Sequence, residues 1–143
     1  MKSILVVCEG NICRSPMGQA LLAQALPVAH VQSAGLGALV GYPADSTAMQ
    51  LMAARGLDIS AHRAQQITRA LCLQSDLVLV MDTDQRQRVE ALYPQVRGRV
   101  FRLAEPLKQD IPDPFRQSEL AFREALALID AGTTGWLRRI VRL

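Results

Sequence analysis

The sequence predicts an α/β fold in which an open, four-stranded parallel sheet carries helices on both faces. Three observations lead to this prediction. Short apolar runs rich in β-branched residues alternate with helical segments, as in parallel βαβ units. Two of these runs, SILVV and LVLV, are almost entirely apolar, which is typical of strands buried on both faces. A length of 143 residues, without repeats or a linker, suits one domain spanning residues 1–143.

The elements are expected in the following order. Strands are predicted at residues 3–7, 28–34, 77–80 and 99–103. The first helix should open at Ser15 and Pro16, because Ser is a favoured N-cap and Pro a favoured first helical residue, and should end near Pro27. Further helices are predicted at residues 45–55, 68–73, 83–92 and 119–142. Gly132 and Gly135 are expected to be weak points of the last helix.

The composition favours a globular protein without a nucleic-acid partner. Half of the residues are hydrophobic, and 16 Lys and Arg against 13 Asp and Glu give a net charge of +3. No basic stripe is interleaved with aromatic residues, as a nucleic-acid surface would require. The basic cluster of Arg138, Arg139 and Arg142 is expected to be the solvated end of a helix.

The three cysteines, Cys8, Cys13 and Cys72, favour a reducing environment. An odd number of cysteines argues against a secreted disulfide scaffold. The apolar run that follows Lys2 is too short for a signal peptide or a membrane span. We therefore expect a cytoplasmic protein, and a monomer is the simplest expectation.

The segment CEGNICRS, residues 8–15, lies between the first strand and the first helix. The carboxyl ends of parallel strands form the ligand-binding edge of such sheets, so the first strand delivers Cys8 to that edge. The following helix N-terminus suits a phosphate dianion, and Gly10 and Asn11 let backbone N–H groups converge on it. The guanidinium of Arg14 can donate hydrogen bonds to two phosphoryl oxygens. The same positive field favours a nucleophilic thiolate at Cys8, to which Ser15 can donate its hydroxyl.

A phosphate-binding loop is therefore expected after the first strand. Its residues are Glu9, Gly10, Asn11, Ile12, Cys13 and Arg14. The alternative is a buried Cys and a surface Arg beside an ordinary turn, since a bare C-x5-R pattern has many chance matches. The preceding buried strand and the following helix start favour the phosphate site.

A second segment, IPDPF, offers an acid for a leaving oxygen. Asp113 lies between two prolines that limit the freedom of the loop at residues 104–117, so its carboxyl can be pre-positioned. Phe115 can line a pocket for an aromatic leaving group. On its own this Asp-Pro pair reads as a plain turn. Together with the cysteine loop it predicts a general acid.

The motifs VVCEGNICRSP and DPF resemble those of the low-molecular-weight protein-tyrosine phosphatases, over nearly the whole chain. The resemblance implies a four-stranded parallel sheet, no cofactor and no metal. It implies the catalytic residues Cys8 as nucleophile, Arg14 as clamp and Asp113 as acid, with Ser15 supporting the thiolate. It also implies a bracing network that the family builds from an Asn, a Ser and a His, here Asn11, Ser33 and His62.

The resemblance also implies roles around the pocket. Cys13 matches a second loop thiol that can form a reversible disulfide with Cys8, and a small buried residue is an equal alternative. The substrate-pocket residues are Ile12, Leu39 and Phe115. Leu39 and Arg116 replace aromatic residues common in animal members, and Glu9 stands where apolar residues are common. Cys72 receives no role.

SAGLGALVG and DPFRQS resemble most the bacterial members linked to capsule and exopolysaccharide production. This implies a phosphotyrosine phosphatase that works through phosphocysteine on a bacterial tyrosine autokinase. An arsenate reductase of the same fold is disfavoured, because no cysteine follows the third strand at Met81. A non-catalytic phosphopeptide-binding module is disfavoured because Cys8 and Asp113 are both present. Neither His30 nor His62 has zinc-ligand spacing to the cysteines.

Overall fold

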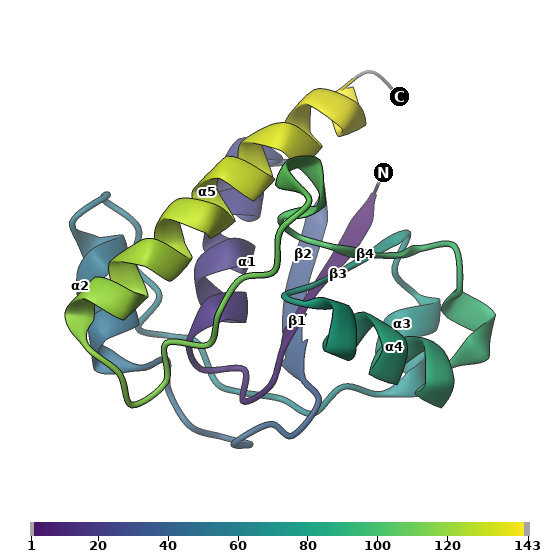
Figure 1. Ribbon diagram of the computed structural model, residues 1–143, viewed down its shortest axis with the longest axis horizontal. Helices are drawn as coiled ribbons and strands as arrows, with labels where there is room; N and C mark the ends of the chain where they lie inside the picture. Colours follow the sequence, from purple (N-terminus) through teal and green to yellow (C-terminus); the bar gives the residue numbers. More distant parts are fainter. Residues whose placement is uncertain (1, 142–143) are drawn as a thin grey trace.

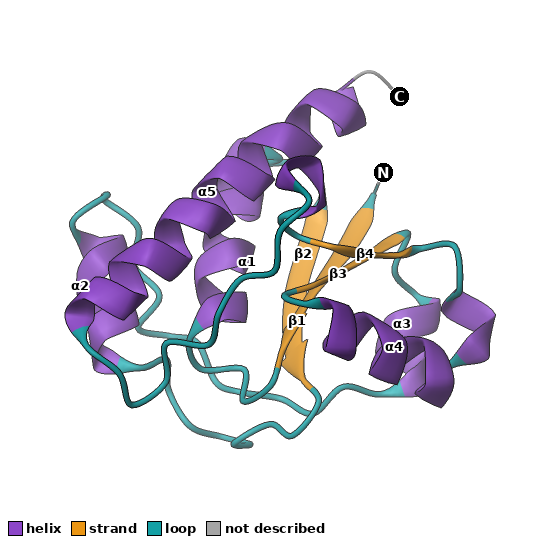
Figure 2. Ribbon diagram, in the orientation of Figure 1, coloured by secondary structure: helices purple, strands orange, loops and turns teal. Residues whose placement is uncertain are grey.

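A four-stranded parallel sheet forms the centre of the computed structural model, which describes residues 2–141. Its strands lie in the order β2–β1–β3–β4, so β1 and β3 are central (Figures 1 and 2). The strands are β1 Ser3–Cys8, β2 His30–Gly35, β3 Leu77–Val80 and β4 Val100–Arg102. The register places Cys8 opposite Gly35 and Val6 opposite Leu79. The predicted fold class is confirmed.

Helices cover both faces of this sheet. One face carries α1 (Arg14–Ala25), α2 (Ser46–Ala53) and α5 (Glu119–Val141), and Figure 1 shows α5 running across that layer. The other face carries α3 (Arg69–Leu73) and α4 (Thr83–Leu92). Two short 3-10 turns, η1 (Pro94–Val96) and η2 (Glu105–Leu107), flank β4.

The two cores follow from alternation along β1. Ile4, Val6 and Cys8 point into the core beneath α1 and α5, whereas Leu5 and Val7 point into the core beneath α4. All five side chains are buried, as expected for a central strand of a parallel sheet. The last inward position on this strand is Cys8, which therefore lies at the carboxyl edge of the sheet, where its backbone is paired with Gly35 of β2.

Two predicted boundaries were wrong for local reasons. The second strand begins at His30 rather than at residue 28, because Ala29 N–H donates to the Leu26 carbonyl in a turn that leaves Val28 exposed. Ser15 is not an N-cap: α1 begins at Arg14, and Ser15 is buried within the first turn. Its hydroxyl is engaged by Cys8 instead of by the helix backbone.

The glycines of α5 are not weak points, because the helix continues through both of them. A Cβ at Gly132 would meet the Leu103 carbonyl oxygen, and a Cβ at Gly135 would meet the Pro106 ring. Both positions are therefore places where α5 approaches the segment after β4 too closely for a side chain. The gain in packing outweighs the low helix propensity of glycine.

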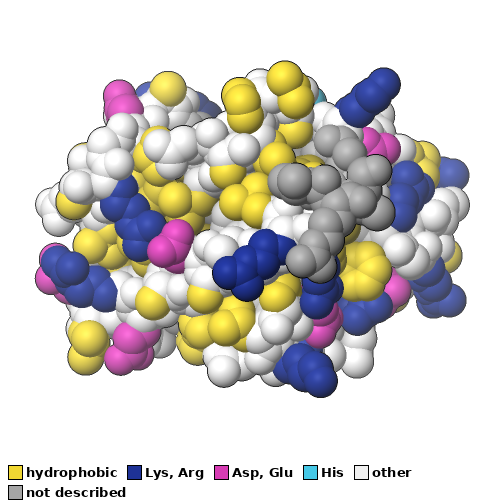
Figure 3. All heavy atoms as spheres, turned by 90° about the horizontal axis from the view of Figure 1, so that it is seen from above, with side chains coloured by type: hydrophobic (Ala, Val, Ile, Leu, Met, Phe, Trp, Pro, Cys, Tyr) yellow, Lys and Arg dark blue, Asp and Glu magenta, His cyan; other side chains and the backbone are white. Residues whose placement is uncertain are grey.

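The surface mixes charges of both signs. Figure 3 shows Lys and Arg side chains interspersed with Asp and Glu over the face seen from above. Arg138 and Arg139 are exposed at the end of α5, as predicted, and Arg142 lies outside the described residues. Within residues 2–141, none of the helices is both long enough and apolar enough to span a membrane.

Candidate active site

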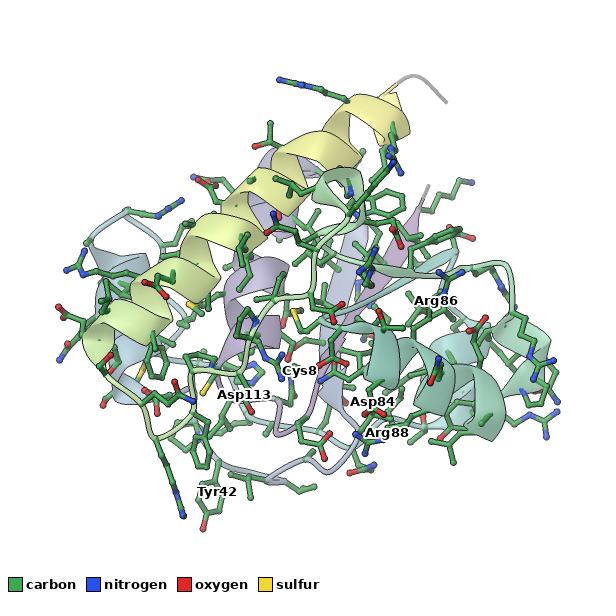
Figure 4. All side chains as sticks on the ribbon, viewed as in Figure 1. Cys8, Tyr42, Asp84, Arg86, Arg88 and Asp113 are labelled. Atoms are coloured by element: carbon green, nitrogen blue, oxygen red, sulfur yellow. The ribbon has the colours of Figure 1, made fainter. Side chains whose placement is uncertain are left out.

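The predicted loop between β1 and α1 forms the floor of a pocket at the carboxyl edge of the sheet. Figure 4 shows Cys8 and Asp113 close together at this edge, with α4 on the other side of Cys8. The pocket has a volume of about 160 Å³. Its lining residues are Cys8, Glu9, Gly10, Ile12, Cys13, Arg14, Gly37, Leu39, Asp113 and Phe115.

Asn11 fixes the shape of the loop. Its backbone is in the left-handed region, with φ of 59°, and its side chain is fully buried. Nδ2 donates to Ser15 Oγ at 2.7 Å and to Ser33 Oγ at 3.0 Å, while Oδ1 accepts from Gln65 N–H at 2.9 Å. The Asn11 carbonyl lies 2.7 Å from His62 Nε2. The structure therefore brings together all the residues of the expected bracing network.

The protonation of His62 follows from its surroundings. Burial lowers the pKa of His62 below its ordinary value, more than the bond to the Asn11 carbonyl raises it. The ring is therefore neutral at neutral pH. Since a carbonyl oxygen can only accept, Nε2 carries the proton and donates it to Asn11.

Ser15 stands next to the sulfur of Cys8. The two side-chain atoms, Cys8 Sγ and Ser15 Oγ, are 2.9 Å apart in a buried setting. Because Ser15 Oγ already accepts from Asn11 Nδ2, its own proton is free to point at the sulfur. This arrangement stabilises a negative charge on Cys8 through a charge-assisted hydrogen bond.

Arg14 is buried, with an exposed fraction of 3%, and its guanidinium is held from one side. Nη1 donates to the Ile111 carbonyl at 2.6 Å and lies 3.8 Å from Asp82 Oδ2. Nη2 lies 3.7 Å from Asp113 Oδ2. Among residues 2–141, Nε has no hydrogen-bond partner. Nε and Nη2 are thus the donors available for bidentate contact with an oxyanion.

Asp113 sits at the mouth of the pocket, with its side chain half exposed. Its Oδ1 accepts from the Phe115 N–H at 3.1 Å, which leaves Oδ2 facing Arg14. The loop is held at its base by Asp110, whose Oδ1 accepts from Thr83 N–H at 3.1 Å and from Arg102 Nη1 at 3.1 Å. The prediction that this carboxyl meets the cysteine loop therefore agrees with the geometry.

Comparison with known proteins agrees with this site. Residues 3–142 match the low molecular weight phosphotyrosine protein phosphatase family. The chain belongs to this family. It is 55% identical over 140 residues to a "probable low molecular weight protein-tyrosine-phosphatase EpsP" of Ralstonia solanacearum, covering 98% of this chain and 97% of that protein.

Solved structures show the same fold. Vibrio vulnificus Wzb, in complex with benzylphosphonate, superposes with a TM-score of 0.93 at 40% identity, covering 96% of this chain and 98% of that one. The arginine phosphatase YwlE of Geobacillus stearothermophilus superposes with a TM-score of 0.92 at 28% identity, covering 99% and 94%. The bacterial relatives confirm the resemblance that the sequence motifs indicate.

Two charged groups of this phosphatase site are absent from the sequence-based prediction. Asp82 follows β3 and caps α4 through Oδ1, which accepts from Gln85 N–H at 2.8 Å, while Oδ2 faces Arg14. Its place after a buried strand at the same sheet edge was a usable signal. Arg88 of α4 forms an ion pair with Glu9, and a pair separated by 79 residues leaves no local signal.

The other two thiols differ from Cys8 in their surroundings. Cys13 is buried at the pocket floor, where burial, followed by the charge of Asp45, raises its pKa far above the ordinary thiol range. Cys72 is buried in the core beneath α4, and burial raises its pKa to about 11. Cys13 is therefore kept as a neutral thiol in the same pocket as Cys8.

The rim of the pocket is apolar with one added charge. Leu39 and Phe115 are each 37% exposed, and the Arg116 guanidinium stacks over the Phe115 ring at 5.1 Å. Ile12 is buried beneath them. The three predicted substrate-pocket residues thus lie around one opening, and Arg116 packs against the rim.

Proposed function

We propose that this phosphatase hydrolyses phosphotyrosine in two steps through a phosphocysteine intermediate. The observation that carries the proposal is the alignment of Cys8 Sγ, backed by Ser15 at 2.9 Å, with Arg14 and with the Asp113 carboxyl at the pocket mouth. The Cys8 thiolate attacks phosphorus while Asp113 gives its proton to the departing tyrosine oxygen. Water then attacks phosphocysteine, Asp113 takes its proton, and inorganic phosphate leaves with Cys8 restored as thiolate.

Arg14 serves both steps in this proposal. Its free donors Nε and Nη2 bind two equatorial phosphoryl oxygens as charge is redistributed in the transition state. Ser15 stabilises the sulfur anion before attack and again as sulfur leaves. The residues that brace the loop, Asn11, Ser33 and His62, are proposed as positioning residues rather than as reacting groups.

The shape of the pocket supports an aryl phosphate as substrate. Cys8 is only 2% exposed, so the phosphoryl group must reach past Ile12, Leu39 and Phe115 to meet the sulfur. A phenyl ring spans that apolar stretch, whereas the short side chain of phosphoserine does not. Binding of benzylphosphonate by the related Wzb is in line with an aromatic phosphonate in this position.

Two rival activities are less well supported. Arsenate reduction needs a further thiol to resolve the arsenic adduct, but Cys72 is buried in the opposite core and burial keeps Cys13 protonated. Hydrolysis of phosphoarginine is suggested by the likeness to YwlE. A guanidinium substrate would favour a free carboxylate on the wall, and here Glu9 is already paired with Arg88.

A panel of substrates tests the activity. We expect turnover of a phosphotyrosine peptide, little turnover of phosphoserine or phosphoarginine peptides, and no thiol-dependent reduction of arsenate. Cys8→Ser should abolish turnover because a Ser hydroxyl is scarcely ionised at neutral pH. Substantial activity in Cys8→Ser, or a preference for phosphoarginine, would refute the proposal.

We further propose that the enzyme acts as a cytoplasmic monomer on a tyrosine kinase that governs polysaccharide export. The support is the likeness to EpsP and the three free, buried cysteines. A substrate-trapping pull-down with Asp113→Ala from the native host tests the partner. Recovery of a phosphorylated tyrosine kinase supports it, and recovery of other phosphotyrosine proteins alone contradicts it.

A further inference from the structure

An ion pair links the phosphate-binding loop to α4. Arg88 Nη1 lies 2.8 Å from Glu9 Oε2, and Arg88 Nη2 lies 3.4 Å from Glu9 Oε1, so the contact is two-pronged. Glu9 lines the pocket directly after Cys8. An added Cβ at Gly37 would be 3.2 Å from Glu9 Oε1, so the carboxylate is confined between this glycine and the guanidinium.

Arg88 offsets the negative charge that Glu9 places on the pocket wall. A carboxylate on the wall of a pocket that binds a phosphate dianion repels the ligand. Arg88 cancels that charge at hydrogen-bond distance. Asp84, one turn earlier on α4, lies 3.7 Å from Arg88 Nη1 and competes for the same guanidinium from a more exposed position.

We infer that Arg88 sets the affinity of the pocket for the phosphate dianion, because its guanidinium neutralises Glu9 on the pocket wall. The inference rests on the proposed function, since it concerns the same pocket. It assigns Arg88 no contact with the reacting atoms. Its effect is on binding rather than on the chemical step.

The chain supplies a matched control on the same helix. Arg86 also belongs to α4, but it lies over the Phe101 ring at 5.4 Å and within 3.8 Å of Glu105. Figure 4 shows Arg86 on the side of α4 toward β4, whereas Arg88 and Asp84 lie on the side toward the loops around the pocket. Because Arg86 is held by Phe101 and Glu105 and does not line the pocket, Arg86→Gln should not affect phosphate binding.

The test measures binding of inorganic phosphate by calorimetry and turnover of an aryl phosphate, at about 0.15 M salt. Arg88→Gln should raise the phosphate Kd and the KM by about fivefold with little change in kcat, as expected for an unpaired wall carboxylate. Glu9→Gln should lower both by about two- to fivefold. The double variant should return close to the parent, and Arg86→Gln should leave both constants unchanged. The effect of Arg88→Gln should shrink at about 1 M salt.

The opposite signs separate this inference from a structural role. If the pair only holds the loop in shape, Glu9→Gln and Arg88→Gln both weaken phosphate binding, and that result overturns the inference. An Arg86→Gln effect equal to that of Arg88→Gln also overturns it. Calorimetry does not depend on turnover, so absence of phosphatase activity would count against the proposed function while the binding constants still decide the role of Arg88.

Discussion

Replacing Asp113 by Asn probes the acid step most directly. Asn keeps an oxygen in the position of Oδ1, so the bond from Phe115 N–H at 3.1 Å can persist and the loop should keep its shape. The anchors of the loop at Ile111 and Asp110 are untouched. The substitution therefore removes the transferable proton from the pocket mouth while leaving the positioning of the carboxamide nearly unchanged.

Two effects of Asp113→Asn can be separated by their size. Losing general acid catalysis costs about 10²–10⁴ in rate, or about 3–5 kcal/mol. Losing the ion pair with Arg14, which is 3.7 Å long and half exposed, costs at most about 1 kcal/mol, or fivefold. Loss of acid catalysis slows only esters with poor leaving groups, whereas loss of the ion pair changes the rate by the same factor for every ester.

The assay is the pre-steady-state burst of the released phenol, measured for a series of aryl phosphates of increasing leaving-group acidity. The burst isolates the first step from hydrolysis of phosphocysteine. Asp113→Asn should show a large loss with phosphotyrosine that diminishes to about fivefold or less with a dinitrophenyl ester. Asp110→Asn serves as the control: it keeps the Asp113 carboxyl and weakens only the anchor at Thr83 and Arg102, so its loss with phosphotyrosine should be much smaller than that of Asp113→Asn.

An equal loss across the series in Asp113→Asn would show that Asp113 is not the acid. In that case Asp110 or Glu105 would be the next carboxylates to test. If the rate loss depended steeply on the leaving group in Asp110→Asn but not in Asp113→Asn, Asp110 would be the acid instead of Asp113.

Three further outcomes are expected. Arg14→Lys should lower kcat for an aryl phosphate by about 100-fold or more, because an ammonium cannot make the two-pronged contact in the transition state; a change confined to KM would contradict this. Burial lowers the pKa of His62, so the urea midpoint of unfolding should fall as the pH drops from 6.5 through the lowered pKa of the folded protein. This fall should be smaller in His62→Gln, whereas His30→Gln, at an exposed position, should behave as the parent. Gly132→Ala should destabilise the fold by about 1–3 kcal/mol in urea unfolding, whereas the exposed Thr134→Ala should change stability little; equal effects would argue against close packing of α5.

Features set by local pattern were accessible from the sequence. The strand Leu77–Val80 and the helix Thr83–Leu92 were predicted to the residue, because an apolar run and a capped polar helix each carry their signal within a few positions. The same holds for the cysteine loop, whose strand and helix are its neighbours in the chain.

Features set by tertiary contact were not accessible. Ser15 was expected both to cap α1 and to contact Cys8. Only the contact with Cys8 is found, and the further bond from Asn11 depends on how the loop closes. The contact of Glu9 with Arg88 depends on β3 lying beside β1, which brings α4 to the loop from far along the chain. Periodicity predicts that α4 exists but not which of its arginines reaches the pocket.

The bond from Arg14 Nη1 to the Ile111 carbonyl shapes how this enzyme can diverge in evolution. Every amino acid carries a main-chain carbonyl, so no replacement at position 111 deletes the acceptor. The Ile111 side chain is fully buried in the core beneath α1 and α5, and selection there acts on its volume. The distance between Arg14 and the loop that carries Asp113 is thus set by a main-chain contact. The side chains of this loop can change while the loop keeps its position relative to Arg14.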